Sequence, residues 1–295
     1  MTTKENLSYS KKEMCQTEKN IFNILKQAKE FLTSHNITEA QLDAEVLLCG
    51  VLKITRSKLP TIRQEIITQE TIQKYQNFLD RRITGEPVDY ILGTAEFMGL
   101  NFKVNPNVLI PRPETELIVE QATKFIKEKN LKTVLDLCTG SGAIAISVAY
   151  YNDISVIASD ISKKALQVAK DNAVTNNVSK KIEFIESNMF DNIIDKKFDI
   201  IISNPPYVTE KEYKDLEKEL FFEPKNAFLA GNDGLYFYKI IANKVSQYLN
   251  PKGILLLELN SNISLQIADL FDKFLFVKII KDYSNLDRIL IVQNG

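Results

Sequence analysis

The sequence contains no tryptophan, one histidine and three cysteines among 295 residues. With His35 as the only histidine, we expect neither a histidine-based metal centre nor a Ser-His or Cys-His nucleophile. His35 follows a predicted helix, where it is expected to be a surface or cap residue. Cys15, Cys49 and Cys138 form no C-x-x-C pair and no zinc spacing, so we expect no metal and a reducing, cytoplasmic location.

The chain also lacks an excess of charge and any apolar stretch of membrane-spanning length. Its 37 Lys and Arg nearly balance its 38 Asp and Glu, and the first 80 residues are balanced too, with eleven against ten. This balance argues against a surface that binds the phosphates of a nucleic acid. The first residues also do not resemble a secretory signal peptide, so we do not expect secretion. At 44% hydrophobic and 25% charged, the composition is that of an ordinary globular protein, long enough for two domains. We expect a monomer with no membrane or direct nucleic-acid partner.

The most informative motif is Asn204-Pro205-Pro206-Tyr207, which follows the apolar run 198–203. That run is typical of a buried strand. Each proline lacks an N–H and restricts the residue before it, so the corner after the strand is stiff. The Asn204 side-chain oxygen and the Pro205 carbonyl could together accept both hydrogens of a planar NH2 group. This suggests methyl transfer to an amide or amine nitrogen; the alternative is a Pro-Pro turn that closes a strand.

A cofactor site is predicted upstream, where strand 133–137 leads into a glycine turn and then a helix of small residues. The glycines allow the backbone to approach a ligand, and the N–H groups at the helix start face it. A second strand, 154–159, ends at Asp160, which is placed to accept hydrogen bonds from ribose hydroxyls. The residues predicted to bind the cofactor in this unit are Asp136, Cys138, Thr139, Gly140, Ser141, Gly142 and Asp160.

The turn also satisfies a dinucleotide fingerprint, G-x-G-x-x-A at 140–145, so a dehydrogenase is an alternative. Three observations count against it. Asp136 precedes the glycines, as suits a cofactor with a free ammonium group. No histidine follows that could assist hydride transfer. The corner at 204–207 ends the strand next to the first one, and doubly wound sheets bind ligands at that switch point.

The chain divides into a helical part, a linking hairpin and a regular βα part. Helical spacing appears from residue 21, a capping box at 38–41 opens a second helix, and a third begins near Thr68 and ends at 85–87. The preceding residues, 1 to about 17, lack periodicity and are expected to be mobile. We assign 1–84 to a helical domain, 85–107 to a hairpin linker that includes 90–93, and 108–295 to the catalytic domain.

Regular alternation of strands and helices after residue 115 predicts an α/β fold with a parallel sheet. Before this region, Arg112 lies between two prolines. The segment around it could be a linker in which Thr115 or Glu114 caps the following helix. Alternatively, it could form a lid over the cofactor or contact the substrate. Residues 208–233 are long and irregular and are predicted to form an active-site loop.

With these motifs, the chain from about residue 20 resembles the release factor N5-glutamine methyltransferases. The motif at 204–207 is shared with adenine-N6 methyltransferases. The segments 85–93 and 110–116 are more specific for the release factor enzymes, and residues 222–224 and 287–288 also match that family. Three departures from the family pattern stand out. Cys138 stands where the family often has glycine, and Asn188 and Met189 replace an acidic-aromatic pair. Asn260 and Ile263 stand where a glycine and a glutamine are common.

The resemblance implies a class I methyltransferase with a Rossmann-like, doubly wound sheet and an antiparallel last strand. It implies S-adenosylmethionine as donor, S-adenosylhomocysteine as product, and the glutamine of the release factor's Gly-Gly-Gln loop as acceptor. The small N-terminal helical domain would grip the protein substrate. Donor-binding residues would also include Asn188, Met189 and Asn204, while Arg112 and 204–207 would hold the substrate. Two alternatives remain: a DNA or RNA adenine-N6 methyltransferase, and a non-catalytic protein-binding module with this fold.

Overall fold

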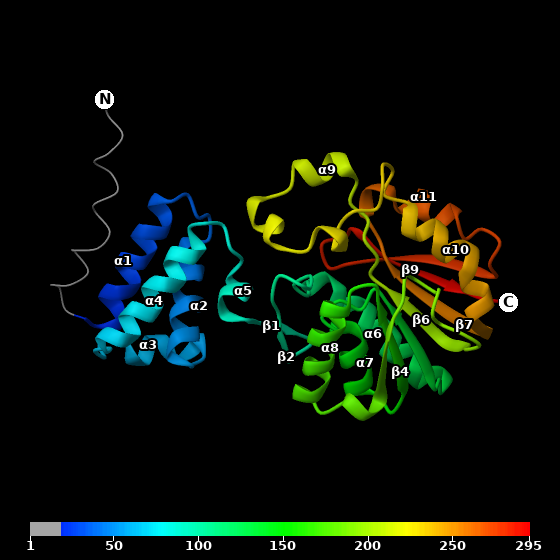
Figure 1. The fold of residues 1–295 in the computed structure, drawn as a ribbon, viewed down its shortest axis with the longest axis horizontal. Coiled ribbons are helices and arrows are strands. Elements are labelled where there is room, and N and C mark those ends of the chain that lie inside the picture. The colour runs from blue at the N-terminus through cyan, green and yellow to red at the C-terminus, as the bar shows by residue number, and fades with distance from the viewer. Residues whose placement is uncertain (1–18) are drawn as a thin grey trace. The chain divides into compact units, whose positions relative to one another are not determined.

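The computed structural model describes residues 19–295 and contains two compact units, one ending at Leu92 and the other running from Gly93 to Gly295 (Figure 1). Cys15 and the segment expected to be mobile lie outside the described residues. No helix in the described part of the chain has the length and apolar character needed to cross a membrane. The two units are described separately below.

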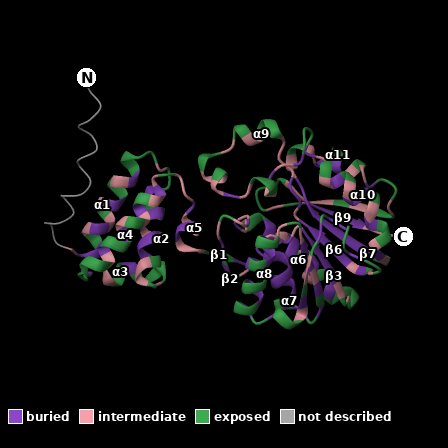
Figure 2. Ribbon diagram, in the orientation of Figure 1, coloured by how far each residue is buried: buried purple, intermediate pink, exposed green. Residues whose placement is uncertain are grey.

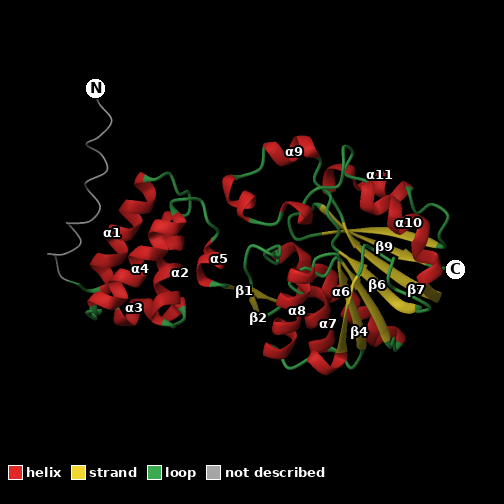
Figure 3. Ribbon diagram, in the orientation of Figure 1, coloured by secondary structure: helices red, strands yellow, loops and turns green. Residues whose placement is uncertain are grey.

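The first unit is helical, as predicted (Figure 3). Its elements are α1 (Ile21–Ser34), α2 (Ala40–Leu52), η2 (Arg56–Lys58), α3 (Leu59–Ile62), α4 (Gln69–Arg82) and α5 (Val88–Leu92). The Thr68 hydroxyl accepts a hydrogen bond from the Thr71 N–H and caps α4. His35 is the exposed C-cap of α1, confirming the sequence prediction. Within the core, the Tyr75 hydroxyl donates to the Ala44 carbonyl at 2.7 Å.

Two local predictions in this unit are wrong. The capping box at 38–41 does not form: Glu39 is the N-cap of α2 and makes no side-chain capping bond. Residues 90–92 belong to helix α5, not to the hairpin. Pro87 explains the second error, because its fixed φ suits a helix start and its carbonyl accepts from the Ile91 N–H at 3.0 Å. A five-residue helix is too short to show helical periodicity in the sequence.

The second unit is built on a seven-stranded sheet of order β5-β4-β3-β6-β7-β9-β8 (Figure 1). Only β9 runs against its neighbours, which confirms the predicted fold class and its antiparallel last strand. The strands are β3 (Thr133–Leu137), β4 (Ser155–Asp160), β5 (Ile182–Glu186), β6 (Phe198–Ser203), β7 (Leu249–Glu258), β8 (Phe276–Lys281) and β9 (Asp287–Gln293). A separate hairpin of β1 (Thr94–Phe97) and β2 (Leu100–Lys103) precedes the sheet.

Helices cover both faces of the sheet, so its central strands are buried on both sides (Figure 2). Val134 and Ile200 pack with α6 (Glu116–Lys129) and α7 (Ala143–Tyr151). The alternate residues Leu135 and Ile201 pack with α10 (Tyr236–Tyr248) and α11 (Ser264–Asp269) on the other face. Each fully buried Leu or Ile contributes about 2 kcal/mol through the hydrophobic effect, which explains why β3 and β6 consist mainly of apolar residues.

The remaining elements lie in the connections. They are η3 (Pro113–Thr115), α8 (Lys163–Thr175), η4 (Ser179–Lys181), α9 (Glu210–Lys214), η5 (Lys218–Phe222), η6 (Lys225–Ala227) and η7 (Ser261–Ile263). Residues 208–233 contain only the short α9, η5 and η6 between irregular stretches (Figure 3). The carboxyl ends of β3, β4, β5 and β6 meet at one edge of the sheet, where the loops that follow them lie side by side.

Candidate active site

A cavity of about 650 Å³ lies at the carboxyl ends of the parallel strands in the second unit. Its size is within the range of small-molecule sites. It is lined by residues after four strands: Cys138 and Gly140 after β3, Asp160 to Ser162 at β4, Ser187 to Met189 after β5, and Asn204 and Pro206 after β6. The lining is completed by Asn107 to Leu109, Ala165, Pro224 to Ala227, Leu229, Tyr236 and Phe237. The two motifs that the sequence singled out therefore share one cavity.

Asp160 organises the glycine turn. Its Oδ2 accepts the Gly140 N–H and its Oδ1 accepts the Ser162 N–H, both at 2.9 Å. Burial raises the pKa of this carboxyl, and the backbone N–H donors oppose that rise. Each carboxylate oxygen keeps a second lone pair. Asp160 can therefore accept hydroxyl hydrogens from a ligand in the cavity while it holds the turn.

Asp136, predicted to bind the cofactor, is fully buried and does not line the cavity. Its Oδ2 accepts the Thr139 hydroxyl at 2.6 Å and the Ala145 N–H at 3.2 Å, which braces the turn against the start of α7. Burial raises the pKa of Asp136 to about 7, and Oδ1 has no partner in the described part of the chain. The structure thus gives Asp136 a supporting position behind the turn, and its direct contact with a cofactor stays a prediction.

Cys138 has a positive φ of 61°, which explains why glycine suits this position. Its Sγ lies 3.8 Å from Met189 Sδ, and both residues line the cavity. Burial raises the pKa of the Cys138 thiol, so the group stays protonated and is not a nucleophile. The two sulfur atoms instead give this part of the cavity a polarizable, apolar wall.

Gly142 is the N-cap of α7, with φ of 82°. A Cβ at this position would lie 2.8 Å from Ile146 Cδ1 and 3.1 Å from Ala169 Cβ. The position therefore needs glycine for both its backbone conformation and its close packing against α8. Thr139, Ser141 and Gly142 do not line the cavity but shape the turn beneath it.

We expect Gly142→Ala to lower the free energy of unfolding by about 2–3 kcal/mol. The alanine would have to adopt a left-handed backbone conformation, and its Cβ would clash with Ile146 and Ala169. Gly93→Ala is the matched control, because Gly93 has a similar φ of 77° with no atom within 4 Å of a Cβ. Its cost should be about 1 kcal/mol. Urea unfolding of both variants measures the difference, and equal costs would contradict the packing role of Gly142.

Asn204 lies directly after β6 and lines the cavity. Its Nδ2 donates to Thr115 Oγ1 at 3.4 Å. Pro206 also lines the cavity, whereas Pro205 and Tyr207 do not. Tyr207 packs against the core on the α10 side, and burial raises the pKa of its hydroxyl to about 12. The predicted substrate contacts of Pro205 and Tyr207 stay predictions.

Arg112 does not line the cavity. Its guanidinium pairs with Glu223, whose side chain is buried and whose other oxygen accepts the Ile110 N–H at 2.9 Å. This carboxylate ties residues 110–112 to the long loop. Both neighbouring stretches, 107–109 and 224–227, line the cavity. Arg112 therefore helps hold one wall of the site together, and its direct contact with substrate stays a prediction.

The sequence suggested that the Thr115 side chain could cap α6, but its hydroxyl makes no capping hydrogen bond. Its hydroxyl is instead the acceptor for Asn204. No group of three or more His, Cys, Asp or Glu that could hold a metal ion occurs in residues 19–295.

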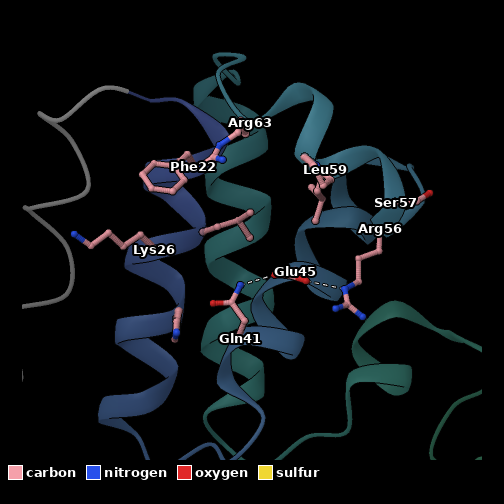
Figure 4. A pocket seen from close by; sticks show the side chains of 11 residues that line it. Phe22, Lys26, Gln41, Glu45, Arg56, Ser57, Leu59 and Arg63 are labelled. Carbon is pink, nitrogen blue, oxygen red and sulfur yellow. Dashed lines mark hydrogen bonds and ion pairs between the residues drawn. The ribbon is translucent and has the colours of Figure 1, made fainter.

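A second cavity, of about 660 Å³, lies in the helical unit (Figure 4). Four of its lining residues are cationic: Lys26, Lys29, Arg56 and Arg63. Its only carboxylate, Glu45, accepts a hydrogen bond from Arg56 Nε at 2.7 Å and another from Gln41 (Figure 4). Phe22, which is 44% exposed, lies beneath the Arg63 guanidinium. We refer to these lining residues as the basic groove.

Comparisons with known proteins cover both units. Residues 23–93 match the family model described as PrmC N-terminal domain, and residues 114–250 match the methyltransferase small domain. A release factor glutamine methyltransferase of Buchnera aphidicola is 43% identical, and the alignment covers 85% of this chain and 91% of that protein. The Fusobacterium nucleatum protein of the same name is 36% identical, with 99% of this chain and 83% of that protein covered.

Among solved structures, a methyltransferase from Pyrococcus furiosus has a TM-score of 0.50 and 19% identity, covering 75% of this chain and 99% of that one. The hMettl16 catalytic domain has a TM-score of 0.54 and 16% identity, covering 77% of this chain and 82% of that one. These two likenesses show the methyltransferase fold.

Proposed function

The chain belongs to the release factor glutamine methyltransferase family, and from that premise we propose how its site performs the reaction. It is a protein methyltransferase that modifies a release factor glutamine. We propose that the donor is S-adenosylmethionine and that the acceptor is the side-chain amide nitrogen, N5, of the glutamine in the Gly-Gly-Gln loop. One observation carries this: the acceptor corner at Asn204 and the turn held by Asp160 line the same cavity.

The residues of the cavity fit this donor. Asp160 has free lone pairs for ribose hydroxyls, and the apolar wall formed by Met189, Ile161 and Leu229 suits a flat adenine ring. Gly140 has a φ of 56° and no atom within 4 Å of where a Cβ would lie, so the backbone is open to a ligand at this point. Cys138 and Asn188 contribute further contacts along the cavity.

An amide nitrogen is a poor nucleophile because its lone pair is delocalised into the carbonyl. The sulfonium of S-adenosylmethionine supplies an electrophilic methyl group, so the main task of the protein is orientation. Asn204 Oδ1 and the Pro205 carbonyl accept the two N–H hydrogens of the glutamine and direct its nitrogen at the methyl carbon. The carbon–sulfur bond breaks as the carbon–nitrogen bond forms, and one N–H proton leaves to solvent. Both oxygens stabilise the positive charge that develops on nitrogen.

Transfer of tritium from labelled S-adenosylmethionine tests the acceptor. We expect label on a bacterial release factor and none on DNA or RNA oligonucleotides that contain adenine. Label on the oligonucleotide alone would contradict the proposal. A non-catalytic module would bind the donor but label neither.

We further propose that the helical unit grips the release factor, and that the basic groove contacts acidic side chains of this substrate. The first 80 residues carry nearly equal numbers of both charges, yet the groove holds four cations and one carboxylate. Glu45 is already paired with Arg56. The uncompensated charge therefore favours an acidic surface.

We expect Lys26→Glu combined with Lys29→Glu to raise the KM for release factor about tenfold at low salt, with kcat nearly unchanged. The difference should shrink at high salt, because screening weakens exposed charge pairs. The matched control is Lys74→Glu, an exposed lysine on α4 outside the groove. Steady-state kinetics at two salt concentrations measure the effect, and an equal rise in KM for the control would refute a role of the groove.

A further inference from the structure

A single buried asparagine joins the glycine turn, residues 139–142, to the hairpin that precedes the sheet. Asn172 lies near the C-terminal end of α8 and is fully buried. Its Nδ2 donates to the Ser141 carbonyl at 2.9 Å and to the Lys103 carbonyl at 3.0 Å. Its Oδ1 accepts the Lys103 N–H at 2.7 Å. Both hydrogens of the NH2 group and the oxygen are therefore used.

The chemistry of these partners allows the Asn172 amide only one orientation. A carbonyl oxygen can only accept a hydrogen bond, and a backbone N–H can only donate one. If the amide turned over, its oxygen would face the Ser141 carbonyl and its NH2 would face the Lys103 N–H. With Lys103, the amide makes the two-way pair of hydrogen bonds that a neighbouring strand would make. Asn172 thus fixes the end of β2 and the glycine turn relative to each other.

The glycine turn is held from three sides. Asp160 accepts the Gly140 N–H, and Asp136 accepts a hydroxyl of the turn. Those two carboxylates hold donor groups, whereas Asn172 holds an acceptor, the Ser141 carbonyl. Gly140 lines the cavity and directly precedes Ser141. The contact made by Asn172 therefore bears on the part of the turn that a ligand in the cavity meets.

The other end of this link leads to another wall of the cavity. Residues 107–109 line the cavity, and the chain reaches them shortly after Lys103. At the far end of this wall, Glu223 accepts the Ile110 N–H. Asn172 thus fixes the chain before the wall and Glu223 fixes the chain after it.

We propose that Asn172 is a positioning residue for the donor, because it fixes the glycine turn against the segment that leads to the wall at 107–109. Asn172 does not line the cavity, so it acts through these two segments. When both are in place before binding, the donor does not have to order them, and this preorganisation strengthens binding. The inference rests on the proposed function, since it concerns the site of S-adenosylmethionine.

Asn172→Ala removes all three hydrogen bonds. We expect the dissociation constant of S-adenosylmethionine to rise about tenfold, because the buried Ser141 carbonyl loses its donor and the turn becomes less ordered. At saturating donor, kcat should fall less than about threefold, since the corner at Asn204 and Pro205 keeps its orientation. Calorimetric titration and steady-state kinetics measure the two effects. A purely structural role would lower the melting temperature without changing donor binding.

Asn176→Ala is the matched control. Asn176 is the C-cap of α8 and is buried, and its Nδ2 donates to the Asn101 carbonyl of the same hairpin at 3.0 Å. Its second acceptor is the Asn172 carbonyl on α8, so neither bond reaches the glycine turn. The substitution removes a buried amide that holds the hairpin, and we expect an unchanged dissociation constant for the donor.

Amide hydrogen exchange in the unmodified chain tests the link without a substitution and decides the question if Asn172→Ala does not fold. The Lys103 N–H donates to Asn172, whereas the Met98 N–H of the same hairpin donates to Glu116 on α6. Saturating S-adenosylmethionine should slow exchange at Lys103 by about threefold more than at Met98, because donor binding orders the turn to which Asn172 is bonded.

An unchanged donor dissociation constant in folded Asn172→Ala would overturn the inference, and so would an equal rise in Asn176→Ala. Where Asn172→Ala does not fold, equal slowing of exchange at Lys103 and Met98 would do the same. Failure of the proposed function is distinguishable, because the unmodified chain would then bind no S-adenosylmethionine or transfer no methyl group to release factor. The inference is judged on the ratio of variant to unmodified dissociation constants, and the proposed function on the unmodified chain.

Discussion

Asn204→Ala is expected to lower kcat about 100-fold or more, while the dissociation constant of S-adenosylmethionine changes by less than about threefold. The substitution deletes the side-chain oxygen that we propose as acceptor, on a residue that lines the cavity after β6. Loss of one preorganised hydrogen-bonding group aimed at developing charge costs about 10²- to 10³-fold in rate. Steady-state kinetics with release factor, together with calorimetric titration of the donor, measure the two effects separately.

Asn188→Ala is the matched control for Asn204→Ala. Asn188 lines the same cavity from the loop after β5, so both variants lose the same amide. We expect the opposite pattern for Asn188→Ala, with weaker donor binding and a kcat close to that of the unmodified chain at saturating donor. Equal losses of turnover and donor affinity in Asn204→Ala would argue that Asn204 only shapes the donor site.

Asp160→Ala should have the second-largest effect, a rise of about 100-fold in the donor's dissociation constant. The carboxylate would no longer accept ribose hydroxyls, and hydrogen bonds to charged groups contribute about 1.5–3 kcal/mol each. The Gly140 and Ser162 N–H groups would also lose their acceptor, so the turn would be less ordered. Calorimetric titration with S-adenosylmethionine measures the change, and saturating donor should recover most of kcat.

Asp171→Ala is the control for Asp160→Ala. Asp171 is an exposed aspartate on α8 whose carboxylate accepts a surface hydrogen bond from Gln167. Its removal should leave donor binding unchanged. A dissociation constant that stays the same in Asp160→Ala would show that the ribose lies elsewhere in the cavity.

The order and type of the main elements could be predicted from the sequence because burial on both faces leaves a clear pattern. The runs that became β3 and β6 are short, apolar and bounded by a glycine turn or by Pro205 and Pro206. The donor turn and the acceptor corner could be found for the same reason. In a parallel sheet, adjacent strands bring their carboxyl ends together, so both motifs were expected at one edge.

Parts of the site could not be predicted because their contacts join distant segments without periodicity. Glu223 accepts the Ile110 N–H across 113 positions of sequence, and no local pattern pairs them. The place of Asp136 before the glycines predicted a cofactor contact, which stays a prediction, but gave no sign of its hydrogen bonds to Thr139 and Ala145. The sequence offered Thr115 or Glu114 as the cap of the following helix, and Thr115 is the N-cap residue of α6 but makes no side-chain capping bond. Its hydroxyl faces Asn204 instead.

The central claim is that a stiff corner after β6 presents two oxygens to the NH2 group of a glutamine beside the donor. The most direct measurement is a crystal structure of the chain with S-adenosylhomocysteine and a Gly-Gly-Gln peptide. We predict that the glutamine nitrogen lies within hydrogen-bonding distance of both Asn204 Oδ1 and the Pro205 carbonyl, and faces the sulfur. A glutamine bound away from this corner, or a donor bound outside the cavity that contains Asp160, would contradict the account.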